Sequence, residues 1–162
     1  MPQLVLSCGF AGGLNPALKT GTVVFATDDD AALTSALFAA GARPVRFHNG
    51  RRVVATATEK KTLWEATGAD AVDMESEIVR AICREHRIPS ATIRVISDAA
   101  DEDLPLDFNA FMTAEYQVHY RKLALALVCS PKKIPRLLRL RRQTRMAATN
   151  LANVLRATLI SS

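Results

Sequence analysis

Residues 71–98 read AVDMESEIVRAICREHRIPSATIRVISD, and this stretch decides the fold class. Its first half predicts a helix, because apolar side chains recur at helical spacing at Met74, Ile78, Ala81 and Ile82. Pro89 then closes the link to residues 91–96, an apolar and β-branched run that predicts a buried strand. A helix that leads directly into an apolar strand is typical of α/β folds.

The flanking sequence continues this alternation. Residues 4–6 predict a short strand that runs into a glycine loop at 7–13, where Gly9, Gly12 and Gly13 permit positive φ and close approach of the backbone to a ligand. The remaining expected elements are strands at 22–26 and 53–56, helices at 31–40, 58–68 and 110–129, a loop at 99–109, and a final helix that begins near Pro135.

Charge divides the chain into two parts. All 16 acidic residues precede residue 116, whereas residues 116–162 carry ten of the 21 lysines and arginines. We therefore expect an α/β core over residues 1–130 and a basic amphipathic helix over 131–162, packed on the core or extending from it. Such a helix suits an anionic membrane surface or a solvated face. Nucleic acid is a weaker alternative, because no aromatic side chains interleave with the arginines.

The number of cysteines and the hydropathy of the chain predict a cytoplasmic protein. Peripheral contact with a membrane is a further expectation. The three cysteines have neither CxxC spacing nor a paired histidine, and their odd number argues against a disulfide framework. The first ten residues lack the charged start of a signal peptide, and no apolar run is long enough to span a bilayer. The three histidines are scattered, so we expect no metal site.

Two carboxylates are the candidate chemical groups. Asp98 follows the strand at 91–96, and the carboxyl ends of strands form the ligand crevice of open α/β sheets. A carboxyl shielded there from water is a usable proton donor, although the residues alone favour Ser97 and Asp98 as a cap on the next turn. Glu75 near a helix start has the same ambiguity, because a carboxylate there is stabilised by the helix dipole.

Three segments resemble the purine nucleoside phosphorylase/methylthioadenosine nucleosidase superfamily. They are SCGFAGGLNPALKTGTVV, GADAVDMESEIVRAICREHRIP and ATIRVISDAAD, and they occur in the family's order over roughly residues 4–101. The resemblance implies a three-layer αβα phosphorylase-like fold with a central mixed sheet. It also implies cleavage of a purine N-glycosidic bond, usually by a homo-oligomer without a cofactor.

The same resemblance implies roles for individual residues. Met74 and Glu75 match the pair that lines the ribose site, with the carboxylate on the sugar hydroxyls. Asp98, with Ser97 beside it, matches the acid that protonates or hydrogen-bonds to the purine leaving group. Gly9 and Phe10 belong to the loop that lies along the sugar and the attacking water or phosphate, and Phe10 either stacks on an apolar part of the ligand or fills the core.

The wording VDMES and RVISD, together with Leu104-Pro105 and the arginine-rich tail, resembles the hopanoid-associated branch of the superfamily. That resemblance implies adenine release from adenosylhopane, a lipid-linked nucleoside. Family members begin with a further strand–helix–strand region, which supplies the group that activates the nucleophile, so we expect a fold that lacks part of this region. Hydrolysis is the favoured reaction. Phosphorolysis, with phosphate as co-substrate, and a non-catalytic membrane- or nucleic-acid-binding remnant are the alternatives.

Overall fold

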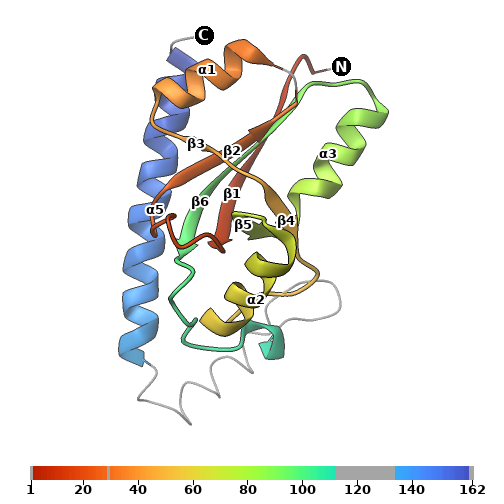
Figure 1. Cartoon of the computed structure of the whole chain (residues 1–162). Coiled ribbons are helices and arrows are strands. Elements are labelled where there is room, and N and C mark those ends of the chain that lie inside the picture. Colours follow the sequence, from red (N-terminus) through yellow and green to blue (C-terminus); the bar gives the residue numbers. More distant parts are fainter. Residues whose placement is uncertain (1, 29, 112–133, 161–162) are drawn as a thin grey trace.

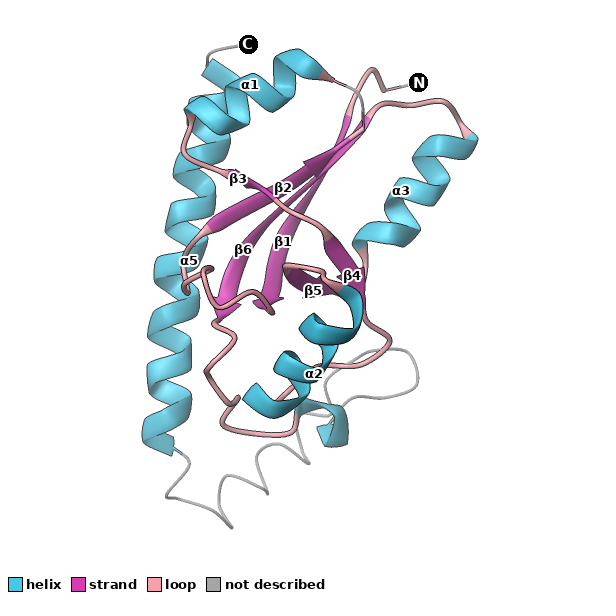
Figure 2. Cartoon of the chain, in the orientation of Figure 1, coloured by secondary structure: helices cyan, strands magenta, loops and turns pink. Residues whose placement is uncertain are grey.

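Six strands form one mixed sheet in the order β3-β2-β6-β1-β5-β4. The computed structural model describes residues 2–28, 30–111 and 134–160. The pairs β1–β6, β2–β3 and β4–β5 are parallel, whereas β1–β5 and β2–β6 are antiparallel. The elements, shown in Figure 2, are β1 (Val5–Gly13), β2 (Val23–Thr27), α1 (Ala31–Ala39), β3 (Arg43–Pro44), β4 (Phe47–Asn49), α2 (Ala57–Thr67), β5 (Ala71–Asp73), α3 (Ser76–Glu85), β6 (Ser90–Asp98), the 3₁₀ turn η1 (Phe108–Phe111) and α5 (Ile134–Ile160).

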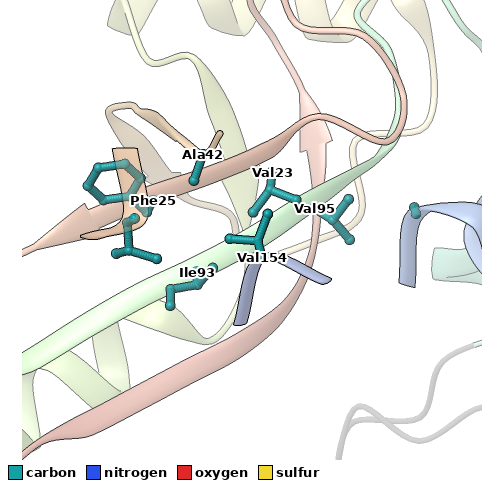
Figure 3. Close-up of a cluster of buried hydrophobic side chains, with 8 residues drawn as sticks. Val23, Phe25, Ala42, Ile93, Val95 and Val154 are labelled. Atoms are coloured by element: carbon teal, nitrogen blue, oxygen red, sulfur yellow. The ribbon is translucent and has the colours of Figure 1, made fainter. Parts of the chain in front are cut away.

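Helices lie on both sides of this sheet. In Figure 1, α5 and α1 lie on one side and α3 on the other, and α5 contacts both β6 and β2. The core between α5 and the sheet contains eight buried residues: Val23, Phe25, Leu37, Ala42, Ile93, Val95, Ala147 and Val154. All of them except Leu37 and Ala147 are labelled in Figure 3. Because β6 is covered on both faces, its residues are buried along nearly the whole strand, polar Thr92 and charged Arg94 included. The predicted three-layer α/β fold with a mixed sheet is confirmed.

Local signals placed several elements correctly. The helix expected at 31–40 is α1, in which the Asp30 side chain accepts a hydrogen bond from the Leu33 amide. The helix expected at 58–68 is α2, which begins with a capping box between Thr56 and Glu59 and ends at Gly68 with φ of 62°. The final helix, α5, begins one residue before Pro135.

The expected glycine loop is wrong, because residues 5–13 form one continuous strand. β1 pairs with β6 along its length and with β5 at Gly12 and Gly13. The reason for glycine is close packing, since a Cβ on Gly12 would lie 3.3 Å from Val72 Cγ1 and one on Gly13 would lie 3.3 Å from the Asp98 carbonyl oxygen. The glycines with positive φ are instead Gly21, Gly41 and Gly68.

Other predictions also needed correction. Residues 53–56 form no strand, because the Asn109 side chain bonds the backbone N–H and C=O of Val53. Residues 71–73 belong to strand β5, so α3 begins only at Ser76. On α3 the expected apolar stripe faces outward, with Ile78 60% and Ile82 53% exposed. The helix expected at 110–129 falls almost entirely outside the described residues, as does the predicted boundary at residue 130.

The basic helix α5 packs on the sheet through a narrow stripe. Ala147, Val154 and Thr158 are buried, whereas the apolar side chains of Leu138, Met146 and Leu159 are more than half exposed. The spacing of seven and four residues keeps the buried side chains on one helix face. Among the described helices, none is both long and apolar enough to cross a membrane.

Candidate active site

A cavity of about 450 Å³ opens where β1 and β6 end together. All six residues predicted for the site line this cavity: Gly9, Phe10, Met74, Glu75, Ser97 and Asp98. Its other walls come from Ala11, Gly12, Arg52, Val53, Val54, Val72, Asp73, Leu104, Phe108, Leu140 and Thr144. The cavity thus combines three carboxylates, those of Asp73, Glu75 and Asp98, with mostly apolar walls, a composition typical of sites for small organic ligands.

A register shift in the sheet aims two consecutive side chains at this cavity. Neighbouring residues of a regular strand point to opposite faces. In the β1–β6 ladder, Ala11 pairs with Ile96 but Gly12 pairs with Asp98, so Ser97 is an extra residue in β6. Because this bulge interrupts the alternation, Ser97 and Asp98 both line the cavity.

Asp73 shapes the segment that carries Met74 and Glu75. Its carboxylate accepts a hydrogen bond from the Ser76 amide at 3.1 Å and another from the Ser76 hydroxyl at 2.6 Å, which caps the first turn of α3. Glu75 occupies the N-cap position of α3 but makes no side-chain capping bond. The capping role that the sequence allowed for Glu75 therefore belongs to Asp73, and the exposed Glu75 carboxylate is free to meet a ligand.

A buried ion pair holds Asp73 in place. Two guanidinium nitrogens of Arg94 lie 2.9 Å from Asp73 Oδ2, and Arg94 Nη1 donates to the Ser7 carbonyl oxygen at 2.7 Å. The side chains of Arg94 and Asp73 are only 2% and 3% exposed. Arg94 belongs to β6 and Asp73 to β5, so this pair connects the motifs VDMES and RVISD across the intervening strand β1.

Asp98 has a buried cationic partner that the sequence analysis missed. Lys60 Nζ, from α2, lies 2.5 Å from Asp98 Oδ2, while the Ser97 hydroxyl donates to Asp98 Oδ1 at 2.5 Å. The Asp98 side chain is 9% exposed and that of Lys60 is fully buried. One signal was present: Lys60 precedes Leu63 and Trp64 by three and four residues, which puts a cation on the inward face of an amphipathic helix.

Glu102 performs the capping that the sequence allowed for Asp98. It accepts a hydrogen bond from the Ala99 amide at 3.0 Å, and it also binds Thr20 at 2.9 Å and Gln143 of α5 at 3.0 Å. Burial acts to raise the pKa of Glu102, but these hydrogen bonds and the nearby Arg139 charge outweigh burial and lower the pKa. Glu102 thus ties the turn after β6 to α5.

A groove of about 390 Å³ adjoins the cavity along α5. Phe10, Phe108, Leu140 and Thr144 line both spaces, and the groove continues past Leu137 and Ala148 to Arg141 and Arg145. Phe10 is 43% exposed, so it forms a wall of the cavity and is not a core residue. The site therefore opens into an apolar channel with cationic side chains at its edge.

Known proteins resemble this chain in sequence and in fold. The sequence profile of the phosphorylase superfamily matches residues 30–128, which include the segments around Glu75 and Asp98. A 5′-methylthioadenosine/S-adenosylhomocysteine nucleosidase of Glaesserella parasuis is 26% identical over 144 residues, which cover 68% of this chain and 63% of the relative. The chain thus spans less than two thirds of the length of that relative.

Two solved structures show the same fold at low sequence identity. The futalosine hydrolase of Helicobacter pylori superimposes with a TM-score of 0.68 at 18% identity, over 99% of this chain and 69% of the other. A Colwellia psychrerythraea 5′-methylthioadenosine/S-adenosylhomocysteine nucleosidase in complex with adenine gives 0.64 at 17% identity, over 97% and 66%. The profile covers more than half of the sequence, and the fold agrees with it. This chain belongs to the phosphorylase superfamily.

Proposed function

We propose that this protein cleaves the N-glycosidic bond of a purine nucleoside and releases adenine. One observation carries the proposal: a single cavity contains Asp98 with Ser97 at the end of β6 and Glu75 with Met74 before α3. Breaking the bond places negative charge on the base and positive charge on the sugar. A proton donor on one side and a sugar-binding carboxylate on the other match both charges.

In this proposal each residue has one task. Asp98 delivers a proton to a ring nitrogen of the departing purine, and Ser97 holds the carboxyl through its 2.5 Å hydrogen bond. Glu75 binds the ribose hydroxyls, and Met74 lies beside the sugar. Gly9 and Phe10 of β1 form the cavity wall along the sugar. The reaction needs no cofactor, and water is the proposed nucleophile, with phosphate as the alternative.

The groove along α5 supports a finer proposal for the substrate. Its apolar wall of Phe10, Phe108, Leu137 and Leu140 suits a nucleoside with a large apolar 5′ substituent, as in adenosylhopane. On α5 the arginines alternate with exposed Leu138 and Met146, which favours peripheral contact with an anionic membrane that holds such a substrate. Flotation of the protein with anionic vesicles at low salt, lost at high salt, is the expected result.

An assay of adenine release tests the central proposal. Adenosine, methylthioadenosine and an adenosyl lipid are supplied with and without phosphate. Release without phosphate supports hydrolysis, and strict dependence on phosphate supports phosphorolysis. No release from any substrate under either condition rejects the enzyme and leaves a non-catalytic, membrane-binding form of the fold.

We also propose that the chain forms a homo-oligomer. Ile78 and Ile82 lie four residues apart on one face of α3, and both are more than half exposed. Light scattering coupled to size-exclusion chromatography measures the mass. Substitution of both isoleucines by lysine is expected to reduce the measured mass to the mass of one chain. A monomeric wild type would contradict this proposal.

A further inference from the structure

The Lys60 ammonium has three oxygen acceptors and no contact with solvent. Nζ lies 2.5 Å from Asp98 Oδ2, 2.8 Å from the Ala99 carbonyl oxygen and 2.8 Å from the Glu102 carbonyl oxygen. An ammonium has three N–H donors, so each donor has one partner. Asp98 lines the cavity, and Lys60 lies behind it as part of α2. Lys60 therefore meets a ligand only through Asp98.

The arrangement shows where a transferable proton resides. Asp98 accepts a hydrogen bond on each oxygen, from Ser97 on Oδ1 and from Lys60 on Oδ2. Of these two donors only Lys60 carries a positive charge, so its ammonium is the stronger acid. A buried ion pair is weak evidence for stabilisation of a fold, because desolvation of both charges offsets their attraction. The position of this pair at the wall of the cavity is better explained by a chemical role.

We infer that Lys60 is a positioning residue that supplies Asp98 with the proton passed to the departing base, an inference that rests on the proposed function. As the bond between the sugar carbon and the base nitrogen breaks, its electron pair goes to the base. Lys60 Nζ gives a proton to Asp98 Oδ2, and Asp98 passes it to the base in the same step, so Asp98 ends with the charge that it had at the start. Water adds its hydroxyl to the sugar carbon, and the proton that it loses to solvent is the equivalent that later restores Lys60.

The surroundings of Nζ fit both states of this relay. After the transfer, Lys60 is a neutral amine with two hydrogens. These two hydrogens match the carbonyl oxygens of Ala99 and Glu102, which lie at equal distances of 2.8 Å from Nζ. The nitrogen lone pair then faces Asp98. The two carbonyl oxygens therefore keep their donors when the proton moves, and only Asp98 Oδ2 loses the hydrogen bond from Lys60.

Two variants and two substrates separate proton supply from structure. Lys60→Met removes the cation, whereas Lys60→Arg keeps a cation that cannot release its proton. Adenosine needs a proton on its leaving group, but 4-nitrophenyl riboside does not. For both variants we expect kcat on adenosine to fall by about 10²-fold. Cleavage of the nitrophenyl riboside should stay within about threefold of wild type.

Lys61→Met is the matched control, because Lys61 is the next residue on α2, and its exposed side chain pairs with Glu65 at 3.8 Å. This variant should leave both substrates unaffected. Full recovery of adenosine cleavage in Lys60→Arg would overturn the inference, because a fixed charge would then suffice. Equal losses on both substrates would also overturn it and would indicate a structural role. Lys60 variants that match an active wild type would reject the relay alone.

A double variant keeps the test valid if Lys60→Met does not fold. Lys60→Met/Asp98→Asn removes both charges, and its rate on adenosine should equal that of Asp98→Asn, because the two residues act in sequence. A further fall of about tenfold would show independent roles and overturn the relay. A wild-type chain inactive on both substrates, with and without phosphate, would reject the proposed function and the relay with it.

Discussion

Arg94 and Asp73 form a buried ion pair with two 2.9 Å contacts, although they belong to strands that are separated in the sheet by β1. The pair holds the segment before α3 against the centre of the sheet, which puts Glu75 at the cavity. The position of the carboxylate that we propose to bind the sugar thus depends on a cation that does not line the cavity itself. Disruption of this pair should affect both folding and ligand binding.

Arg94→Met tests the contribution of this pair to stability. The substitution leaves the Asp73 carboxylate buried without its cation, which should lower the free energy of unfolding by about 3–5 kcal/mol. Urea denaturation monitored by circular dichroism measures the change. Arg84→Met breaks an exposed pair with Glu77 and should lower the free energy of unfolding far less, because solvent screens exposed charges. Similar losses of unfolding free energy in the two variants would show that the buried pair contributes no more to stability than the exposed pair.

Asp98→Asn should reduce adenine release by about 10²–10⁴-fold, because an amide cannot supply the proton that the base needs. Steady-state assays of kcat with adenosine measure the effect. Asp101→Asn is the control, since Asp101 is exposed in the same turn and lies outside the main cavity. If Asp98→Asn retains wild-type kcat, Asp98 is not the acid.

Glu75→Gln should lower kcat/KM by about 10²-fold while stability changes by less than about 0.5 kcal/mol. The separation is expected because Asp73, not Glu75, caps α3. Glu77→Gln, two residues further along the same helix, serves as the control for loss of a carboxylate. A large loss of stability in Glu75→Gln would contradict the assignment of the cap.

Glu102 should make stability depend on pH. Its pKa in the folded protein is lowered below the ordinary value of 4.5, so its contribution is complete above that value and is lost as pH falls through the folded pKa. Wild type should therefore have a higher free energy of unfolding than Glu102→Gln at pH 7. At pH 3 the difference between the two free energies should be smaller. Urea titrations at both pH values measure it, with exposed Glu65→Gln as the reference. A difference that grows toward pH 3 would have the wrong sign.

Ala148→Trp tests the groove along α5. Ala148 lines the groove but not the cavity, so a large side chain there should block an apolar 5′ substituent and leave adenosine unaffected. For an adenosyl lipid we expect kcat/KM to fall by about tenfold, which corresponds to roughly 1.4 kcal/mol. Ala152→Trp, one turn further along the exposed surface of α5, should have no effect. Equal losses on adenosine and on the lipid would disprove a separate groove.

The parts of the fold that the sequence predicted correctly depend on neighbouring residues. Asp30 caps α1 through the amide three residues later, and Gly68 ends α2 with its own positive φ. Such signals act within one turn of backbone and can be read without knowledge of the rest of the chain. The ordered motifs likewise located Asp98 and Glu75, and both line one cavity.

The parts that the sequence did not predict depend on distant residues. Gly12 and Gly13 looked like loop residues, but they are strand residues that are packed against Val72 and Asp98. The partners of Asp98 and Asp73, Lys60 and Arg94, lie 38 and 21 residues away in the chain. Only the completed sheet brings these charges together, so no periodicity or spacing in one segment reveals the pairs.

The extra residue in β6 has a consequence for how this site is inherited. Ser97 and Asp98 share the cavity because β6 has one residue more than β1 between the pairs Ala11–Ile96 and Gly12–Asp98. Deletion of one residue there would restore strict alternation and turn one of the two side chains away from the ligand. We therefore expect a change in the number of residues between Ile96 and Ala99 to be more harmful to the site than most substitutions within the strand. Relatives should diverge at β6 by substitution and hardly ever by a change in length.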